Sequence, residues 1–154
     1  MCWYDYSAVD PAIAISAADL GAMKHTLNND ARRMDWRRKD VDFAAELEKK
    51  LLQRLDAAEA DPSISRVAVV THVPLVEVQM TRKPDDPRWG TSNAYFGNLT
   101  TGRAVLTRPK VKAIISGHSH VGQQGVVSRE GLGDVWTQVV PSDYGTPKFV
   151  IVDV

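Results

Sequence analysis

The sequence has little of what marks secreted, membrane-spanning or nucleic-acid-binding proteins. Its 154 residues include one cysteine, Cys2, which excludes an internal disulfide and favours a reducing compartment. No apolar run approaches the roughly 18 residues of a membrane span, and nothing at the N-terminus resembles a signal peptide. The 19 basic residues balance the 19 acidic ones, so no overall field favours nucleic acid or an anionic membrane. These absences predict a cytoplasmic protein.

Length and composition predict one α/β domain over residues 1–154, large enough to bury a core. Its most regular pattern runs from Asp40 to Ala60, where apolar residues recur at steps of three and four and share one face of a helix. We expect Asp40 to cap this helix, and Glu46 to form an ion pair with Lys50 one turn later.

Short runs of apolar and β-branched residues predict strands along the rest of the chain. They cover residues 1–6, 66–71, 111–116, 122–128, 135–140 and 149–154. The run 66–71 is almost continuously apolar, as in a strand that is covered on both faces. A long connection over 76–97 precedes a short helix over 98–108, and residues 131–134 predict a turn. Residues 8–29 predict loop and short helix.

A basic cluster precedes the long helix. It consists of Arg32, Arg33, Arg37, Arg38 and Lys39, with Trp36 among them. Basic and aromatic residues together are able to bind nucleic acid or a phosphate-bearing ligand. Three aspartates interrupt the cluster and the chain is neutral overall, which favours a solvated face with local ion pairs.

Three of the four histidines stand just past a predicted strand. His72 follows 66–71, while His118 and His120 follow 111–116 after Gly117, which allows a sharp bend. Neutral imidazole is the commonest metal-binding side chain, and a strand end holds it firmly. The pattern therefore predicts a metal site, whereas His25 has no partner nearby in sequence and is expected to be solvated.

Gly117-His118-Ser119-His120 resembles the Gly-His-x-His signature of the calcineurin-like metallophosphoesterases, and the stretch 69–74 around His72 resembles their preceding metal-binding block. The segments 3–6 and 141–144 also suit that family. The resemblance implies hydrolysis of a phosphate-ester substrate at two divalent metal ions (Mn, Fe or Zn). It assigns His72 and His118 to one ion and His120 to the other.

The resemblance covers only the second half of the family pattern. The Asp-x-His, Gly-Asp-x-x-Asp and Asn-His blocks are absent, and so is the histidine that assists the leaving group, which leaves the catalytic residues unknown. The implied fold is a partial two-sheet sandwich in four layers (α/β/β/α) with mixed sheets and without its N-terminal half. The alternative is a non-catalytic remnant that binds metal or forms a homodimer. In that case the exposed sheet pairs with a second copy of the chain, whereas in the enzyme it would pair with the missing half.

Overall fold

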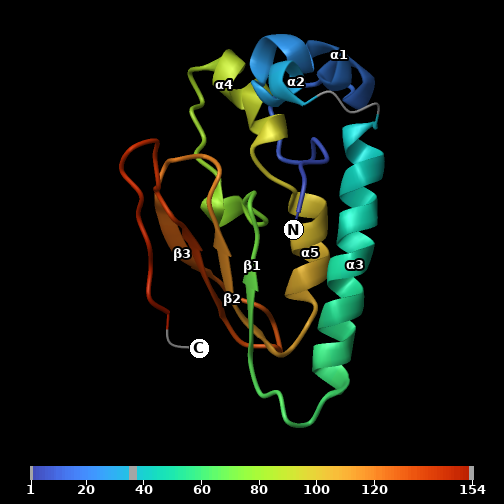
Figure 1. Cartoon of the computed structure of the whole chain (residues 1–154), viewed down its shortest axis with the longest axis vertical. Coiled ribbons are helices and arrows are strands. Elements are labelled where there is room, and N and C mark those ends of the chain that lie inside the picture. Colours follow the sequence, from blue (N-terminus) through green and yellow to red (C-terminus); the bar gives the residue numbers. More distant parts are fainter. Residues whose placement is uncertain (1, 35–37, 153–154) are drawn as a thin grey trace.

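A four-stranded mixed sheet forms the centre of the structure, a computed structural model that describes residues 2–34 and 38–152 (Figure 1). The strands follow the order β1-β2-β4-β3. They are β1 (Val67–Val70), β2 (Val111–Ser116), β3 (Gln123–Val127) and β4 (Val135–Val139). β1, β2 and β4 are parallel, and β3 pairs with β4 in the antiparallel sense. The α/β class and four of the predicted strands are confirmed.

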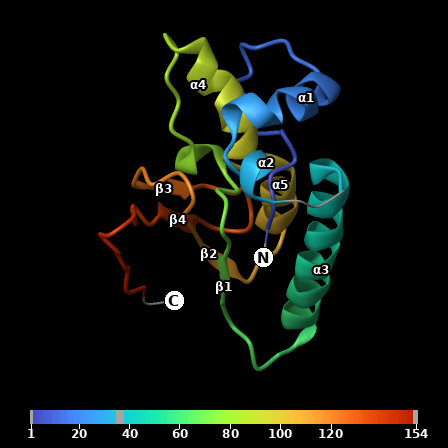
Figure 2. The same cartoon turned by 45° about the horizontal axis from the view of Figure 1, so that its top comes forward.

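Helices α3 (Asp40–Ala60) and α5 (Leu99–Leu106) cover one face of the sheet (Figures 1 and 2). Leu55 of α3 and Val105 of α5 join Ile114 of β2 in the main apolar core. The predicted bounds of α3 are confirmed, as is the Glu46–Lys50 ion pair at 2.6 Å. The predicted cap is wrong, because Lys39 stands at the N-cap position and the Asp40 carboxylate contacts other side chains instead.

The remaining helices are short and gather near the end toward which β1 runs (Figures 1 and 2). They are α1 (Ala17–Leu27), α2 (Asp30–Arg33) and α4 (Pro87–Ser92), with the 3₁₀ turns η1 (Glu77–Gln79) and η2 (Asn93–Tyr95). A second apolar cluster includes Tyr4, Tyr6, Leu20 and Tyr95. The long connection over 76–97 contains η1, α4 and η2, so it is structured, and it is partly buried.

Both chain ends differ from the predicted strands. Residues 2–6 and 149–152 form no strand, and positions 1, 153 and 154 lie outside the described residues. β1 is an edge strand, with Val70 67% exposed, so the prediction that both its faces are covered is wrong. In the described part of the chain there is one sheet, not two. Of the basic cluster, Trp36 and Arg37 lie outside the described residues, while Arg32, Arg33, Arg38 and Lys39 are exposed.

None of the helices within the described residues combines the length and apolar character needed to cross a membrane.

Candidate functional site

The three predicted site histidines lie around one cleft at the carboxyl ends of the parallel strands. The cleft has a volume of about 340 Å³, and its lining includes His72, His118, His120, Asp143 and Tyr144. Crevices outside the carboxyl ends of strands are the usual ligand sites of open α/β sheets. The structure therefore brings these histidines together, while His25 lies on α1 and is exposed, as expected.

Backbone pairing that continues past β1 and β2 sets His72 beside His118. The amide of Thr71 donates to the carbonyl of Ile115 at 2.9 Å, and the amide of Gly117 donates to the carbonyl of His72 at 3.0 Å. Gly117 is not required here for its conformational freedom, because a Cβ atom at this position would meet only the His72 carbonyl oxygen, at 3.9 Å. The sharp bend falls one residue later, at His118.

His118 and His120 both adopt left-handed backbone conformations, with φ of 68° and 57°. Histidine is enriched in this region among non-glycine residues, but the conformation is still uncommon. Strained backbone costs on the order of 1–3 kcal/mol per residue and concentrates at functional sites, where the surroundings hold it in place. The two turns follow directly after β2, and both imidazoles line the cleft.

Both ring nitrogens of His118 are engaged. Nε2 lies 3.0 Å from the backbone carbonyl of Tyr95, which accepts only, so Nε2 carries the proton and donates. In the neutral ring Nδ1 therefore keeps its lone pair, and it faces His72 Nε2 at 2.9 Å. Burial, followed by the neighbouring His72 imidazole, lowers the pKa of His118. Its environment thus favours the neutral imidazole that a metal ligand requires.

The two nitrogens are 2.9 Å apart, the distance of an N–H···N hydrogen bond in which His72 Nε2 donates to the lone pair of His118 Nδ1. To share a tetrahedral ion, in which neighbouring ligand nitrogens lie about 3.3 Å apart, His72 would carry its proton on Nδ1 instead and the two rings would move slightly apart. A backbone carbonyl behind the distal ring nitrogen is also the usual support of a ligating histidine. Within residues 2–34 and 38–152, however, no group of three or more His, Cys, Asp or Glu is placed to hold a metal ion.

His120 has a separate partner in the loop after β4. Its Nδ1 lies 3.2 Å from Asp143 Oδ1, and its ring meets that of Tyr144 edge to face with centroids 5.3 Å apart. Neither Asp143 nor Tyr144 had been predicted as a site residue, and neither had Tyr95. The sequence did contain a signal for Asp143 and Tyr144, since both follow β4, which is parallel to β1 and β2. Nothing in the sequence indicates the carbonyl of Tyr95.

The sequence comparisons overturn the predicted family. No family model and no curated protein sequence matches this chain. A solved structure that it does resemble is described as phosphopantetheinyl hydrolase (PptH) from Mycobacterium tuberculosis, a description that names no such family. The assignment to the calcineurin-like metallophosphoesterases is therefore wrong. It depended on histidines after two strands, and any parallel sheet places such residues at one edge.

The likeness to PptH concerns the fold. The two chains are 19% identical and superpose with a TM-score of 0.55. The match covers 92% of this chain and 48% of PptH, so the chain spans about half the length of that protein. In fold, this chain therefore resembles about half of a hydrolase.

Proposed function

We propose that this chain contributes to a metal-dependent hydrolase of phosphate esters, in which His72 and His118 hold one divalent ion. The observation that carries the proposal is the pair of imidazole nitrogens 2.9 Å apart, with the His118 tautomer fixed by the Tyr95 carbonyl. The fold supports it, because PptH is described as a hydrolase of a phosphopantetheinyl group.

The roles of the chain's own residues follow from their positions. His72 and His118 each turn one ring nitrogen toward the shared position, and Tyr95 orients His118 through its carbonyl. A bound Mn, Fe or Zn ion would act as a Lewis acid on a phosphoryl oxygen. His120, paired with Asp143 and open to solvent, is placed to ligate a second ion or to bind the substrate phosphate.

The second sheet of the expected sandwich also remains a proposal. β3 and β1 leave Val126 and Val70 54% and 67% exposed, and both point to the face of the sheet opposite the α3 and α5 layer. An exposed apolar face of this kind favours pairing. We propose that a further layer packs there. It would come from a longer chain, as the 48% coverage of PptH suggests, or from a second copy.

Metal binding tests the site directly. Titration of the purified chain with Mn²⁺ or Zn²⁺, followed by calorimetry, should show saturable binding that His72→Ala and His118→Asn abolish. Asparagine tolerates the left-handed backbone at position 118. His25→Ala is the matched control, since it removes an exposed histidine that does not line the cleft. Equal binding by all three variants, or no binding by the wild type, would refute the metal site.

Hydrolysis needs its own readout. With Mn²⁺ present, the wild-type chain should hydrolyse p-nitrophenyl phosphate at a low rate that His118→Asn eliminates and His25→Ala preserves. If the chain binds metal but the rate equals that of His118→Asn, the hydrolase proposal fails while the metal site stands. That result would favour the second candidate, a metal-binding or dimerising module, which the exposed Val70 and Val126 support. Sedimentation equilibrium would then show a dimer that Val126→Glu dissociates.

A further inference from the structure

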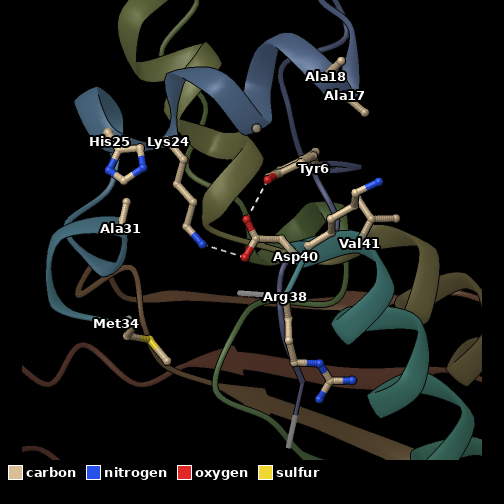
Figure 3. A pocket seen from close by; sticks show the side chains of 12 residues that line it. Tyr6, Ala17, Ala18, Lys24, His25, Ala31, Met34, Arg38, Asp40 and Val41 are labelled. Carbon is tan, nitrogen blue, oxygen red and sulfur yellow. Dashed lines mark hydrogen bonds and ion pairs between the residues drawn. The ribbon is translucent and has the colours of Figure 1, made fainter. Parts of the chain in front are cut away.

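A second cavity, separate from the histidine cleft, lies between α1, α2 and the beginning of α3 (Figure 3). Its volume of about 550 Å³ falls within the usual range of about 300–1,000 Å³ for small-molecule sites. None of His72, His118 and His120 lines it. The proposed hydrolase chemistry makes no use of it.

The floor of this cavity is a pre-organised polar group. The Asp40 carboxylate is buried and accepts from Lys24 Nζ at 2.6 Å and from the Tyr6 hydroxyl at 2.6 Å (Figure 3). Trp3 Nε1 donates to the same carboxylate at 2.7 Å. These three donors hold the carboxylate, so its position is fixed before any ligand arrives. Lys24 has three N–H donors, and it has others left for a ligand in the cavity that it lines.

Tyr6 reaches this floor through an unusual backbone. Its φ is 71°, a genuine outlier for a bulky side chain, which costs on the order of 1–3 kcal/mol. The hydrogen bond to Asp40 and an edge-to-face contact with Tyr95, at 5.7 Å between centroids, hold it there. Strain of this kind is typical of ligand sites, where it places a side chain that relaxed backbone would turn elsewhere.

The charge of the lining is positive. Lys24, Arg38 and Lys39 contribute three cations and Asp40 one anion, an excess of two positive charges among the ionised lining residues. Arg38 also pairs with Glu46, which lies outside the cavity. Lys24 is paired with Asp40 in the same way, so the positive field of the cavity comes chiefly from Lys39 at its mouth.

The walls, by contrast, are apolar and small. Ala18 and Ala31 leave room, and Met34 and Val41 add larger apolar surfaces (Figure 3). A cavity with mostly apolar walls, a few fixed polar groups and excess positive charge suits an amphipathic anion. We propose that it binds a small organic acid with an apolar body, through a carboxylate or phosphate head near Lys39.

The test uses the metal-free chain, so its outcome does not depend on the proposed hydrolase. Uniformly ¹⁵N-labelled protein would be titrated with hexanoate, hexyl phosphate and hexanol, and followed by heteronuclear NMR. We expect saturable shifts at α1, α2 and the first turn of α3 with both anions. Hexanol should bind roughly tenfold more weakly, because it lacks the charge that Lys39 would meet. The two anions distinguish a carboxylate ligand from a phosphate ligand.

Two pairs of variants locate the site. Ala18→Trp, which fills the cavity, should abolish binding, whereas Ala57→Trp on the exposed side of α3 should not. Lys39→Glu should weaken anion binding roughly fivefold, whereas Lys49→Glu, further along the same helix, should leave it unchanged. The proposal is overturned if no titration saturates, if shifts fall on the exposed sheet face, if hexanol matches the anions, or if each variant behaves like its control.

Discussion

Gly102 of α5 offers the sharpest test of how the histidine cleft is held. A Cβ atom built on Gly102 would lie 1.6 Å from the backbone oxygen of Leu75 and 2.6 Å from its carbonyl carbon. Both atoms belong to the segment that follows His72, and a backbone contact has no flexible side chain to move aside. Gly102→Ala therefore has to separate α5 from this segment, by roughly 1.5 Å if an ordinary contact distance is to be restored.

Two opposing effects determine how much Gly102→Ala changes the free energy of unfolding. Alanine is better than glycine in a helix interior by about 1 kcal/mol. Overpacking in a core usually costs about 1–3 kcal/mol, and a clash with fixed backbone belongs at or above the top of that range. The net expectation is a loss of about 2 kcal/mol in the free energy of unfolding. For a chain of this size, that loss lowers the Tm by about 4–8 °C.

Gly21 provides the matched control, because it also lies inside a helix, α1. There an added Cβ atom meets only the Tyr6 hydroxyl, at an ordinary 3.7 Å. Gly21→Ala should therefore raise the free energy of unfolding by about 0.5–1 kcal/mol. Urea denaturation of both variants, compared with the wild type, measures the difference. If Gly102→Ala is as stable as Gly21→Ala, α5 does not approach the Leu75 backbone closely and the reasoning fails.

Further predictions concern stability and reactivity. Arg129 donates five hydrogen bonds to backbone carbonyls around one end of the sheet. Arg129→Lys should therefore lower the free energy of unfolding, measured by urea denaturation, by about 2 kcal/mol. A loss below about 0.5 kcal/mol would mean that water replaces those contacts. Burial raises the pKa of the Cys2 thiol to about 12, so at pH 8 a disulfide reagent should react with it roughly 10³-fold more slowly than with a free thiol, and fast only in urea. Rapid reaction of the native chain would contradict that burial. Hydrogen bonds from Lys50 and Arg38 lower the pKa of the exposed Glu46 to about 2. The contribution of these hydrogen bonds to stability should be present above pH about 4.5 and be lost as the pH falls toward 2. Glu46→Gln should remove this pH dependence in unfolding curves measured across that range. Identical pH profiles of the variant and the wild type would contradict the prediction.

Local chemistry was enough to predict much of the framework. The spacing of apolar residues by three and four positions predicted the helix over 40–60 with its bounds. This pattern can be recognised without knowing what the apolar face packs against. The short helix predicted over 98–108 was equally local, since the Asn98 side chain caps α5 by accepting from the amide of Thr101 at 2.8 Å. The β-branched runs gave β1, β2, β3 and β4 within one or two residues.

Prediction failed where a segment's environment decides its state. The aromatic residues 2–6 have strand propensity, yet they pack among helices, where Tyr4 and Tyr6 meet Tyr95 edge to face. Asp40 looked like a helix cap, but its carboxylate is drawn to Tyr6 and Lys24, which the sequence places far away. Long-range packing overrides local preference in both cases, because burial of a large apolar or charged group outweighs propensities of a few tenths of a kcal/mol.

The sequence by itself determined that three histidines stand after two strands, and that is a statement about order along the chain. Only the tertiary structure decided that β1 and β2 are parallel neighbours, which sets His118 Nδ1 within 2.9 Å of His72 Nε2. The same packing brought the carbonyl of Tyr95 behind His118 and the carboxylate of Asp143 to His120. Such contacts join residues far apart in sequence, and their distances depend on how strands pair and turns close, which local preferences do not specify.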